Sequence, residues 1–149
     1  MDVILFFQGT TRISWMQKLA GVHAFAQSRN WFVQVVERYA TPSEIHRALN
    51  TWNPIGCLVD RAVSAGKAPD AIFKNLPTVY LDQNPLKPSK RHPCLLHDSA
   101  ATASLAIKEL LALKCRSYAY LGTGKNIHWD NDRLARFKKD AKSAGLTIL

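Results

Sequence analysis

The feature that most constrains the fold of this chain is the alternation of short apolar segments with segments of helical periodicity. Val3–Phe7 is a continuous apolar run, which is typical of a strand buried on both faces. From Ser14 onward the apolar residues fall at helical spacing, and the polar stretch 28–30 ends that helix. A second strand is predicted at Trp31–Val36.

The sharpest local pattern is Thr41-Pro42-Ser43-Glu44. Thr41 suits the N-cap of a helix, Pro42 suits its first position, and Glu44 completes a capping box. Asn53-Pro54 stops the helix after about Trp52. The pattern therefore predicts a helix over about 42–52.

The same alternation continues to the end of the chain. The further predicted elements are a strand at Ile55–Val59 ending at Asp60, a short helix at Pro69–Leu76, a strand at Thr78–Leu81, a strand-like segment at Cys94–His97, a helix at Ser99–Leu113 with Asp98 as N-cap, a strand at Ser117–Leu121, a basic helix at Asp130–Ala144 with Gly145 as C-cap, and the start of a strand at Thr147–Leu149. The proline-rich segment Gln83–Pro93 is expected to form a loop or a crossover between lobes. The predicted fold class is α/β, with a parallel doubly wound sheet.

Ligands of such sheets lie beyond the carboxyl ends of the strands. This rule makes four loops candidates: Gln8–Arg12, Asp60–Ala62, Asp82–Asn84 and Gly122–Arg133. Asp82 is interpreted as an acceptor for ligand hydroxyls, with a loop-capping carboxylate as the alternative. Asp60 is interpreted as a turn or salt-bridge residue.

Several classes of chemistry lack their motifs. The five histidines have no metal-ligand spacing, and the three cysteines, Cys57, Cys94 and Cys115, lie far apart with no CxxC pair. No serine or cysteine stands in a nucleophile motif, and no apolar run approaches the roughly 18 residues that a membrane span needs. We therefore expect a cytoplasmic protein that is not an enzyme and that has no metal, no cofactor and no membrane partner.

Gly122-Thr123-Gly124-Lys125 follows a predicted strand and invites comparison with a phosphate-binding loop. The Walker pattern requires glycine where Ala119 stands, and Ser or Thr where Asn126 stands. A glycine-rich turn is the preferred interpretation. The loop is nevertheless the only phosphate cradle available to the alternative hypothesis, a doubly wound enzyme that acts on a phosphorylated or nucleotide substrate.

The positive charge is unevenly distributed. Residues 1–83 hold 8 basic and 6 acidic residues, whereas residues 84–149 hold 12 basic and 5 acidic ones. Such a field could attract nucleic acid, which makes a basic nucleic-acid-contacting module a third hypothesis. A solvated basic face is preferred, because no recognition helix or aromatic platform accompanies the charge.

The stretch from Trp129 to Arg133 (WDNDR) carries the residue types of a polyol site. An aromatic face packs on the C–H side of a sugar ring, and aspartate and arginine form charge-assisted hydrogen bonds with its hydroxyls. The structural alternative is an ordinary helix start, in which Asp130 and Asp132 favour the positive end of the helix dipole and Trp129 packs into the core.

Short motifs over nearly the whole chain have a familiar order: Gly21-Val22, Tyr80-Leu81-Asp82, His97-Asp98, the passage from Asp98 to Thr102 and on to Tyr120-Leu121-Gly122, and Arg133–Phe137. In this order they resemble the lactose-repressor and type I periplasmic-binding-protein superfamily. Trp129 four residues before Arg133, with Phe137 after them, is most similar to the xylose-operon regulators of the arabinose-regulator class. Arg136 stands where the family usually has glycine, which puts the local helix packing in doubt.

The resemblance implies a sugar-sensing region of a bacterial transcription regulator. It implies that Asp82 and Arg133 hydrogen-bond a bound sugar or a similar effector. The weaker assignments, made from position beside the cleft, are Gln8, Arg12, Trp15 and Trp129. It also implies a homodimer that reaches DNA through a separate domain.

The resemblance also predicts how the chain is divided. Residues 1–93 would form the first lobe of an effector-binding domain, and residues 94–149 the crossover and part of the second lobe. Since the family needs a longer chain for two full lobes, we expect a truncated regulator in which the helix-turn-helix domain is absent. The alternative is a half-size protein that completes itself by dimerisation or element exchange.

Overall fold

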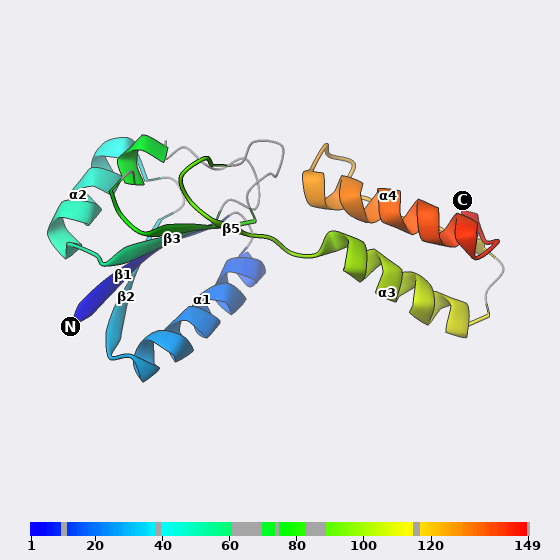
Figure 1. Ribbon diagram of the computed structural model, residues 1–149, viewed down its shortest axis with the longest axis horizontal. Helices are drawn as coiled ribbons and strands as arrows, with labels where there is room; N and C mark the ends of the chain where they lie inside the picture. Colours follow the sequence, from blue (N-terminus) through cyan, green and yellow to red (C-terminus); the bar gives the residue numbers. More distant parts are fainter. Residues whose placement is uncertain are drawn as a thin grey trace. The chain divides into compact units, whose positions relative to one another are not determined.

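The computed structural model describes residues 1–9, 12–37, 40–60, 70–73, 75–82, 89–114 and 117–148. They form two compact units, Met1–Leu96 and His97–Leu149, which are described separately below (Figure 1). Residues 94 and 95 pair with the sheet of the first unit.

The first unit is built on a five-stranded sheet whose strands all run parallel. The strands are β1 (Asp2–Phe7), β2 (Trp31–Val36), β3 (Gly56–Asp60), β4 (Thr78–Leu81) and β5 (Cys94–Leu95), in the order β2-β1-β3-β4-β5. Helix α1 (Arg12–Ser28) covers one face, and α2 (Pro42–Trp52) with the 3₁₀ helix η1 (Asp70–Phe73) covers the other (Figure 1). The predicted doubly wound parallel α/β fold is confirmed.

Both faces of the sheet are apolar because neighbouring residues of a strand point to opposite sides. In β1, Leu5 and Phe7 join the core beneath α2, whereas Phe6 joins the core beneath α1. Leu5 and Phe6 have no exposed surface. The continuous apolar run at the start of the sequence is thus a central strand packed on both sides.

Helix α2 begins as the sequence predicted. Thr41 is the N-cap; its hydroxyl accepts from the backbone N–H of Glu44 at 3.3 Å, and its own N–H donates to the Glu44 carboxylate at 2.7 Å. Asn53 adopts a left-handed conformation (φ 40°) and its N–H donates to the carbonyl of Leu49 at 3.0 Å. The capping box is confirmed.

The second unit contains α3 (Ser99–Ala112), β6 (Ser117–Tyr118), α4 (His128–Ser143) and β7 (Thr147–Ile148). The two helices lie side by side (Figure 1). Strands β6 and β7 form a short parallel pair. The buried core comprises Ala103, Ile107, Tyr118, Phe137 and Ala141. Ser104 of α3 donates to Asp140 of α4 at 2.6 Å, and this bond adds a polar tie between the helices.

Several predicted boundaries were wrong. The helix expected at Pro69–Leu76 is only the four-residue η1 in the described chain. The strands expected at Cys94–His97 and Ser117–Leu121 have two residues each, because each ladder offers only two partners, on β4 and β7 respectively. The last helix starts at His128, two residues earlier than predicted, because the Asp130 carboxylate bonds back to the preceding loop from inside the first turn.

No helix in the described part of the chain has the length and apolar character to cross a membrane.

Candidate functional site

The carboxyl edge of the first sheet has a topological switch point between β1 and β3. From β1 the chain passes to β2 on one side, and the later strands build outward from β3 on the other. In open α/β sheets the crevice at such a point is where ligands bind. Gln8 and Gly9, which follow β1, and Asp60, the last residue of β3, lie at this point.

Gly9 and Asp60 are in close contact. A Cβ on Gly9 would overlap the carboxylate of Asp60, so only glycine leaves room for that side chain. The Asp60 side chain is 1% exposed and points to the face that α1 covers. The switch point is therefore filled by a buried carboxylate that needs a counter-charge.

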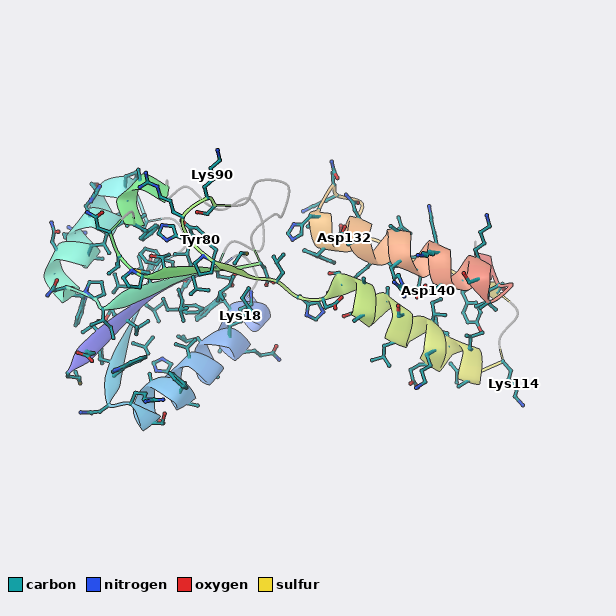
Figure 2. The ribbon with its side chains drawn as sticks, viewed as in Figure 1. Lys18, Tyr80, Lys90, Lys114, Asp132 and Asp140 are labelled. Atoms are coloured by element: carbon teal, nitrogen blue, oxygen red, sulfur yellow. The ribbon has the colours of Figure 1, made fainter. Side chains whose placement is uncertain are left out.

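Lys18, in the second turn of α1, supplies that charge (Figure 2). Its Nζ lies 3.0 and 3.1 Å from the two oxygens of Asp60 and 2.7 Å from Oδ2 of Asp82. The three contacts can engage all three donors of the ammonium group. We call Lys18, Asp60 and Asp82 the strand-end ion cluster. The interpretation of Asp60 as a salt-bridge residue is confirmed.

The cluster stabilises the charged form of Lys18. Burial lowers the pKa of the ammonium group, but the hydrogen bonds that it donates to Asp82 and Asp60 and the negative charges of both carboxylates raise that pKa more. The net result is a pKa above the ordinary value of 10.5. Lys18 is therefore a permanent cation at neutral pH, and the three groups together carry one negative charge when both carboxylates are ionised.

Asp82 has an unusual backbone. It follows β4 with φ of 53°, in the left-handed region that few residues other than glycine adopt. Its N–H donates to the carbonyl of Leu95 at 2.8 Å, which fixes the turn. The side chain is 25% exposed, and among the described residues only Lys18 bonds it, through Oδ2. Oδ1 is left to accept from outside the cluster.

The other residues predicted in the first unit have different surroundings. Gln8 is half-buried, and its N–H donates to the carbonyl of Val36 at 3.0 Å. Trp15 is also half-buried and packs against the core under α1, which contains Phe6 and Leu81. The side chain of Arg12 lies outside the described part of the chain. Binding roles for these three residues remain predictions.

In the second unit a different set of groups surrounds a carboxylate. Asp130, 7% exposed, accepts from the Tyr120 hydroxyl at 2.7 Å, the Thr123 N–H at 2.7 Å and the Thr123 hydroxyl at 2.6 Å. Two hydroxyls and one amide satisfy this carboxylate, and no lysine in the described part of the chain bonds it. We call Tyr120, Thr123 and Asp130 the hydroxyl cluster.

These bonds shift the pKa values of the cluster in opposite directions. The hydrogen bonds from Thr123 and Tyr120 hold the pKa of Asp130 below its usual value of 3.8. Burial, with the charge of Asp130 beside it, raises the pKa of Tyr120 to about 12. At neutral pH the carboxylate is ionised and the phenol keeps the proton that it donates.

Arg133 and Trp129 lie one turn apart on α4 and contact each other. The guanidinium carbon is 4.7 Å from the centre of the indole ring, which is the geometry of a cation–π pair. Nε of Arg133 is buried, and no described residue accepts its hydrogen bond. A buried donor without a partner is costly, so this atom is a candidate to bind a ligand. The two predicted residues are thus brought together, half-buried.

The glycine-rich turn is not arranged as a phosphate cradle. The backbone N–H of Thr123 is occupied by Asp130, and the N–H of Lys125 donates to the Thr123 hydroxyl at 3.3 Å. A bound phosphate would lie against the carboxylate of Asp130, which is ionised at neutral pH. The interpretation of 122–125 as a turn fits these contacts.

Two structurally important residues escaped the sequence analysis. Lys18 was missed because it stands beside Leu19 on the apolar side of its helix. The signal that could have indicated it is the pair of aspartates at adjacent strand ends, since two nearby carboxylates favour a cation. Asp130 was interpreted either as part of a polyol site or as a charge at the start of the helix dipole, because its bonds to Thr123 depend on the path of the loop. Arg136, expected to disturb packing, is exposed and its Nε lies 2.9 Å from the Asp140 carboxylate.

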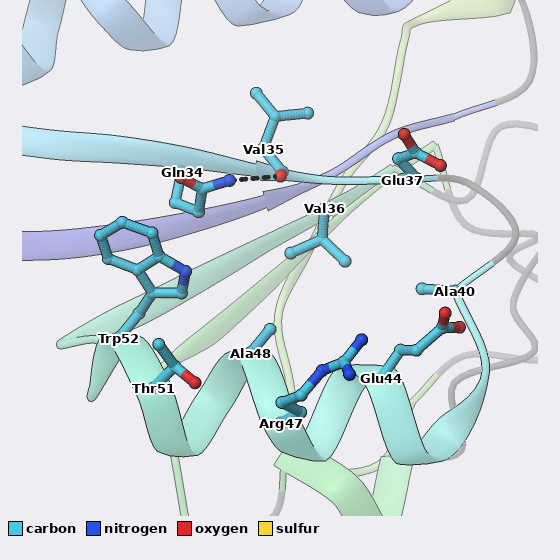
Figure 3. Close-up of a pocket in the computed structure, with 10 residues that line it drawn as sticks. All are labelled: Gln34, Val35, Val36, Glu37, Ala40, Glu44, Arg47, Ala48, Thr51 and Trp52. Atoms are coloured by element: carbon cyan, nitrogen blue, oxygen red, sulfur yellow. Dashed lines mark hydrogen bonds between the residues drawn. The ribbon is translucent and has the colours of Figure 1, made fainter.

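The described part of the first unit also has an open groove of about 430 Å³ between the edge strand β2 and helix α2 (Figure 3). Its lining includes Gln34, Glu37, Glu44, Arg47 and Trp52. The Gln34 amide donates to the carbonyl of Val35 at 2.8 Å and so occupies part of the free strand edge. No group of three or more His, Cys, Asp or Glu side chains in the described residues could hold a metal ion.

Comparisons with known proteins give matches at the level of structure. No family model matches the sequence, and no curated protein matches it. The lactose repressor bound to the anti-inducer ONPF has a TM-score of 0.76 at 18% identity, with 98% of this chain and 56% of that one covered. The trehalose repressor from Escherichia coli has a TM-score of 0.74 at 14% identity, with coverages of 99% and 58%.

A periplasmic binding protein/LacI transcriptional regulator from Alkaliphilus metalliredigens, solved with D-xylulofuranose, has a TM-score of 0.70 at 13% identity. The match covers 99% of this chain and 55% of that chain. The chain thus spans a little over half the length of these structures. It has the parallel α/β fold of the periplasmic-binding-protein-like effector domains in LacI-type regulators.

Proposed function

We propose that this chain is part of the effector-sensing region of a sugar-responsive transcription regulator. The observation that carries the proposal is the buried Nε of Arg133, which lies over Trp129 and has no partner among the described residues. Asp82 supports it from the first unit, with one carboxylate oxygen fixed by Lys18 and the other free to accept. These are the groups with which proteins bind polyols.

In the proposed mechanism, Asp82 accepts from effector hydroxyls, and Arg133 donates to effector oxygens. The effector binds one state of the sensing region more tightly than another, and it shifts that equilibrium only by the difference between its affinities for the two states. A DNA-binding domain elsewhere in the regulator would respond to the shift.

The test is isothermal titration calorimetry on the natural polypeptide that carries this sequence, with a panel of pentoses, hexoses and trehalose. We expect at least one sugar to bind with a measurable heat. Arg133→Lys should weaken that binding about tenfold or more, because lysine lacks the planar fork of donors and stacks less well on Trp129.

Arg136→Lys is the matched control. Arg136 lies on the same helix, is exposed and contacts Asp140, so the substitution should leave sugar affinity within about twofold, since exposed ion pairs contribute little. If no sugar in the panel releases heat, or if Arg133→Lys and Arg136→Lys have the same affinity, the proposal is wrong.

The finer parts of the proposal come from the sequence. The resemblance of Trp129, Arg133 and Phe137 to the xylose-operon regulators makes D-xylose the first sugar to test. One of the compared structures is a dimeric lactose repressor. We propose a homodimer here as well, with DNA bound through a separate domain, and light scattering of the same polypeptide tests the dimer.

The basic second half supports one further candidate, direct contact with nucleic acid. Arg136, Lys138, Lys139 and Lys142 are all exposed on α4. Phosphate contacts give a steep fall in affinity with salt, so a titration of DNA binding from low to physiological salt separates this function from sugar sensing. A flat profile excludes it.

A further inference from the structure

The strand-end ion cluster carries an inference about which ligands this edge accepts, and it rests on the function proposed above. We propose that Lys18 is a positioning residue of the effector site, which holds Asp82 for a ligand hydroxyl and makes the edge accept uncharged polyols in preference to phosphorylated ones.

The first step of the argument is geometric. Oδ2 of Asp82 lies 2.7 Å from Nζ of Lys18, so the carboxylate has one fixed oxygen. The backbone of Asp82 is fixed as well, by its N–H bond to Leu95 and its left-handed conformation. A partly exposed carboxylate that is held at both ends presents its second oxygen in one direction. Pre-organised acceptors bind a hydroxyl with less loss of side-chain entropy.

The second step concerns Asp60. Its side chain is 1% exposed and accepts from Lys18 through both oxygens, in space that a Cβ at position 9 would fill. Lys18 is therefore anchored by a group that a ligand cannot reach. This anchoring makes Lys18 a fixed support for Asp82, and a less suitable partner for the ligand itself.

The third step concerns charge. The three contacts of Nζ can use all three of its donors, so Lys18 has little left to offer an anion. An ionised phosphate has no proton to donate to Asp82. A hydroxyl has such a proton. The cluster therefore favours a neutral sugar over its phosphate ester.

Calorimetry with matched ligand pairs tests this inference on the same polypeptide. The pairs are D-glucose with glucose 6-phosphate, D-ribose with ribose 5-phosphate, and trehalose with trehalose 6-phosphate. We expect the sugar that binds to do so at least tenfold more tightly than its phosphate ester. Asp82→Asn should weaken binding of the neutral sugar and reduce the discrimination, because the oxygen that stays an acceptor faces Lys18, an amide NH2 replaces the other oxygen, and the negative charge is lost.

Lys18 itself is tested with two variants, since Lys18→Met alone removes a cation from the buried Asp60 carboxylate. Lys18→Met/Asp60→Asn removes both members of the buried pair and keeps the net charge of the cluster, so it should fold. We expect it to bind the neutral sugar about tenfold more weakly, the loss of a bond to a charged group, while still rejecting the phosphate ester. Lys18→Arg should recover most of the affinity, and Lys90→Met, at an exposed lysine, should change nothing (Figure 2).

The outcomes are distinguishable. If the wild type binds a neutral sugar but the double variant binds it within twofold, Lys18 does not position Asp82 and the inference is overturned. Equal affinity for a sugar and its phosphate ester overturns it as well. If the wild type binds no ligand of either kind, the proposed function itself is wrong, and the inference falls with it.

Discussion

The two units of this chain each hold a carboxylate near a strand end, but they hold it by different means. In the first unit Asp60 is paired with the ammonium group of Lys18, at 3.0 Å. In the second unit the bonds to Asp130 come from two hydroxyls and one backbone amide, with distances of 2.6–2.7 Å. One site is held by charge, and the other by neutral donors.

This difference predicts how the stability of each unit responds to substitutions in its cluster. Removing one member of a buried ion pair leaves the charge of the other member without that partner. Removing one of three neutral donors leaves the carboxylate with its other two hydrogen bonds. The first unit should therefore respond sharply to a single substitution. The second should respond gradually. The predictions below test this contrast.

The largest effect is expected from Lys18→Met. The substitution removes the Lys18 ammonium group from the Asp60 carboxylate, which is 1% exposed. Removing one partner of a buried pair costs about 3–5 kcal/mol, and about 3 kcal/mol is expected here because Lys18 is itself a quarter exposed. Urea unfolding monitored by circular dichroism measures the loss.

Lys90→Met is the control for that substitution, because Lys90 is exposed and its change should stay within about 0.5 kcal/mol. Thr123→Val in the second unit, which removes one hydroxyl from Asp130, should cost less than Lys18→Met. Equal losses for the two would end the distinction between a charged and a neutral cluster.

The next effect compares two glycines that face these carboxylates. A Cβ at Gly9 would overlap the Asp60 side chain, whereas a Cβ at Gly122 would lie 3.2 Å from Oδ2 of Asp130. Gly9→Ala should destabilise the protein by about 1–3 kcal/mol, in the range of overpacked cores, and Gly122→Ala by less. Thermal unfolding of both variants gives the order, and a larger cost at Gly122 would contradict the structure.

The two clusters should also respond to opposite ends of the pH scale. Asp130 has a lowered pKa, so its contribution is present above the unfolded value of 3.8 and is lost as pH falls through the folded value. Lys18 has a raised pKa, so its contribution is present below 10.5 and is lost as pH rises through the folded value.

Unfolding free energies measured from pH 2 to 5 and from pH 9.5 to 12 check this pair of signs. Asp130→Asn should flatten the acidic limb relative to the wild type, and Lys18→Arg should extend the alkaline one. If Asp130→Asn altered the free energy of unfolding only in the alkaline range, the contribution of Asp130 to the acidic limb would be disproved.

The smallest effect is expected at Gly21, in the interior of α1. A Cβ there meets nothing within 4 Å, and the position is exposed. Gly21→Ala should stabilise the protein by about 0.5–1 kcal/mol, since alanine loses less backbone entropy in a helix. A loss of stability would mean that this face of α1 is covered by something else.

Much of the fold could be predicted because it depends on local patterns. The run 3–7 and the strand 31–36 are apolar at every position that the sheet buries, and Thr41 with Glu44 forms a complete cap from neighbouring residues. Elements that depend on distant partners were less accurate. The lengths of β5 and β6 are set by β4 and β7, and the start of α4 by a bond from Thr123.

The same division applies to the candidate site. Asp82 and Arg133 could be chosen from their places after a strand and at a helix start, but Lys18 could not, because its partners are 42 and 64 residues away in the chain. Nor could the sequence indicate that Nε of Arg133 is buried without an acceptor among the described residues.

The sequence by itself determined the order of strands and helices, the caps of α2 and the apolar faces of the sheet, because these follow from spacing and from contacts within a few residues. The tertiary structure decided which charges meet. Only the folded sheet places the ends of β3 and β4 beside α1, and only there does Lys18 find two carboxylates at hydrogen-bonding distance.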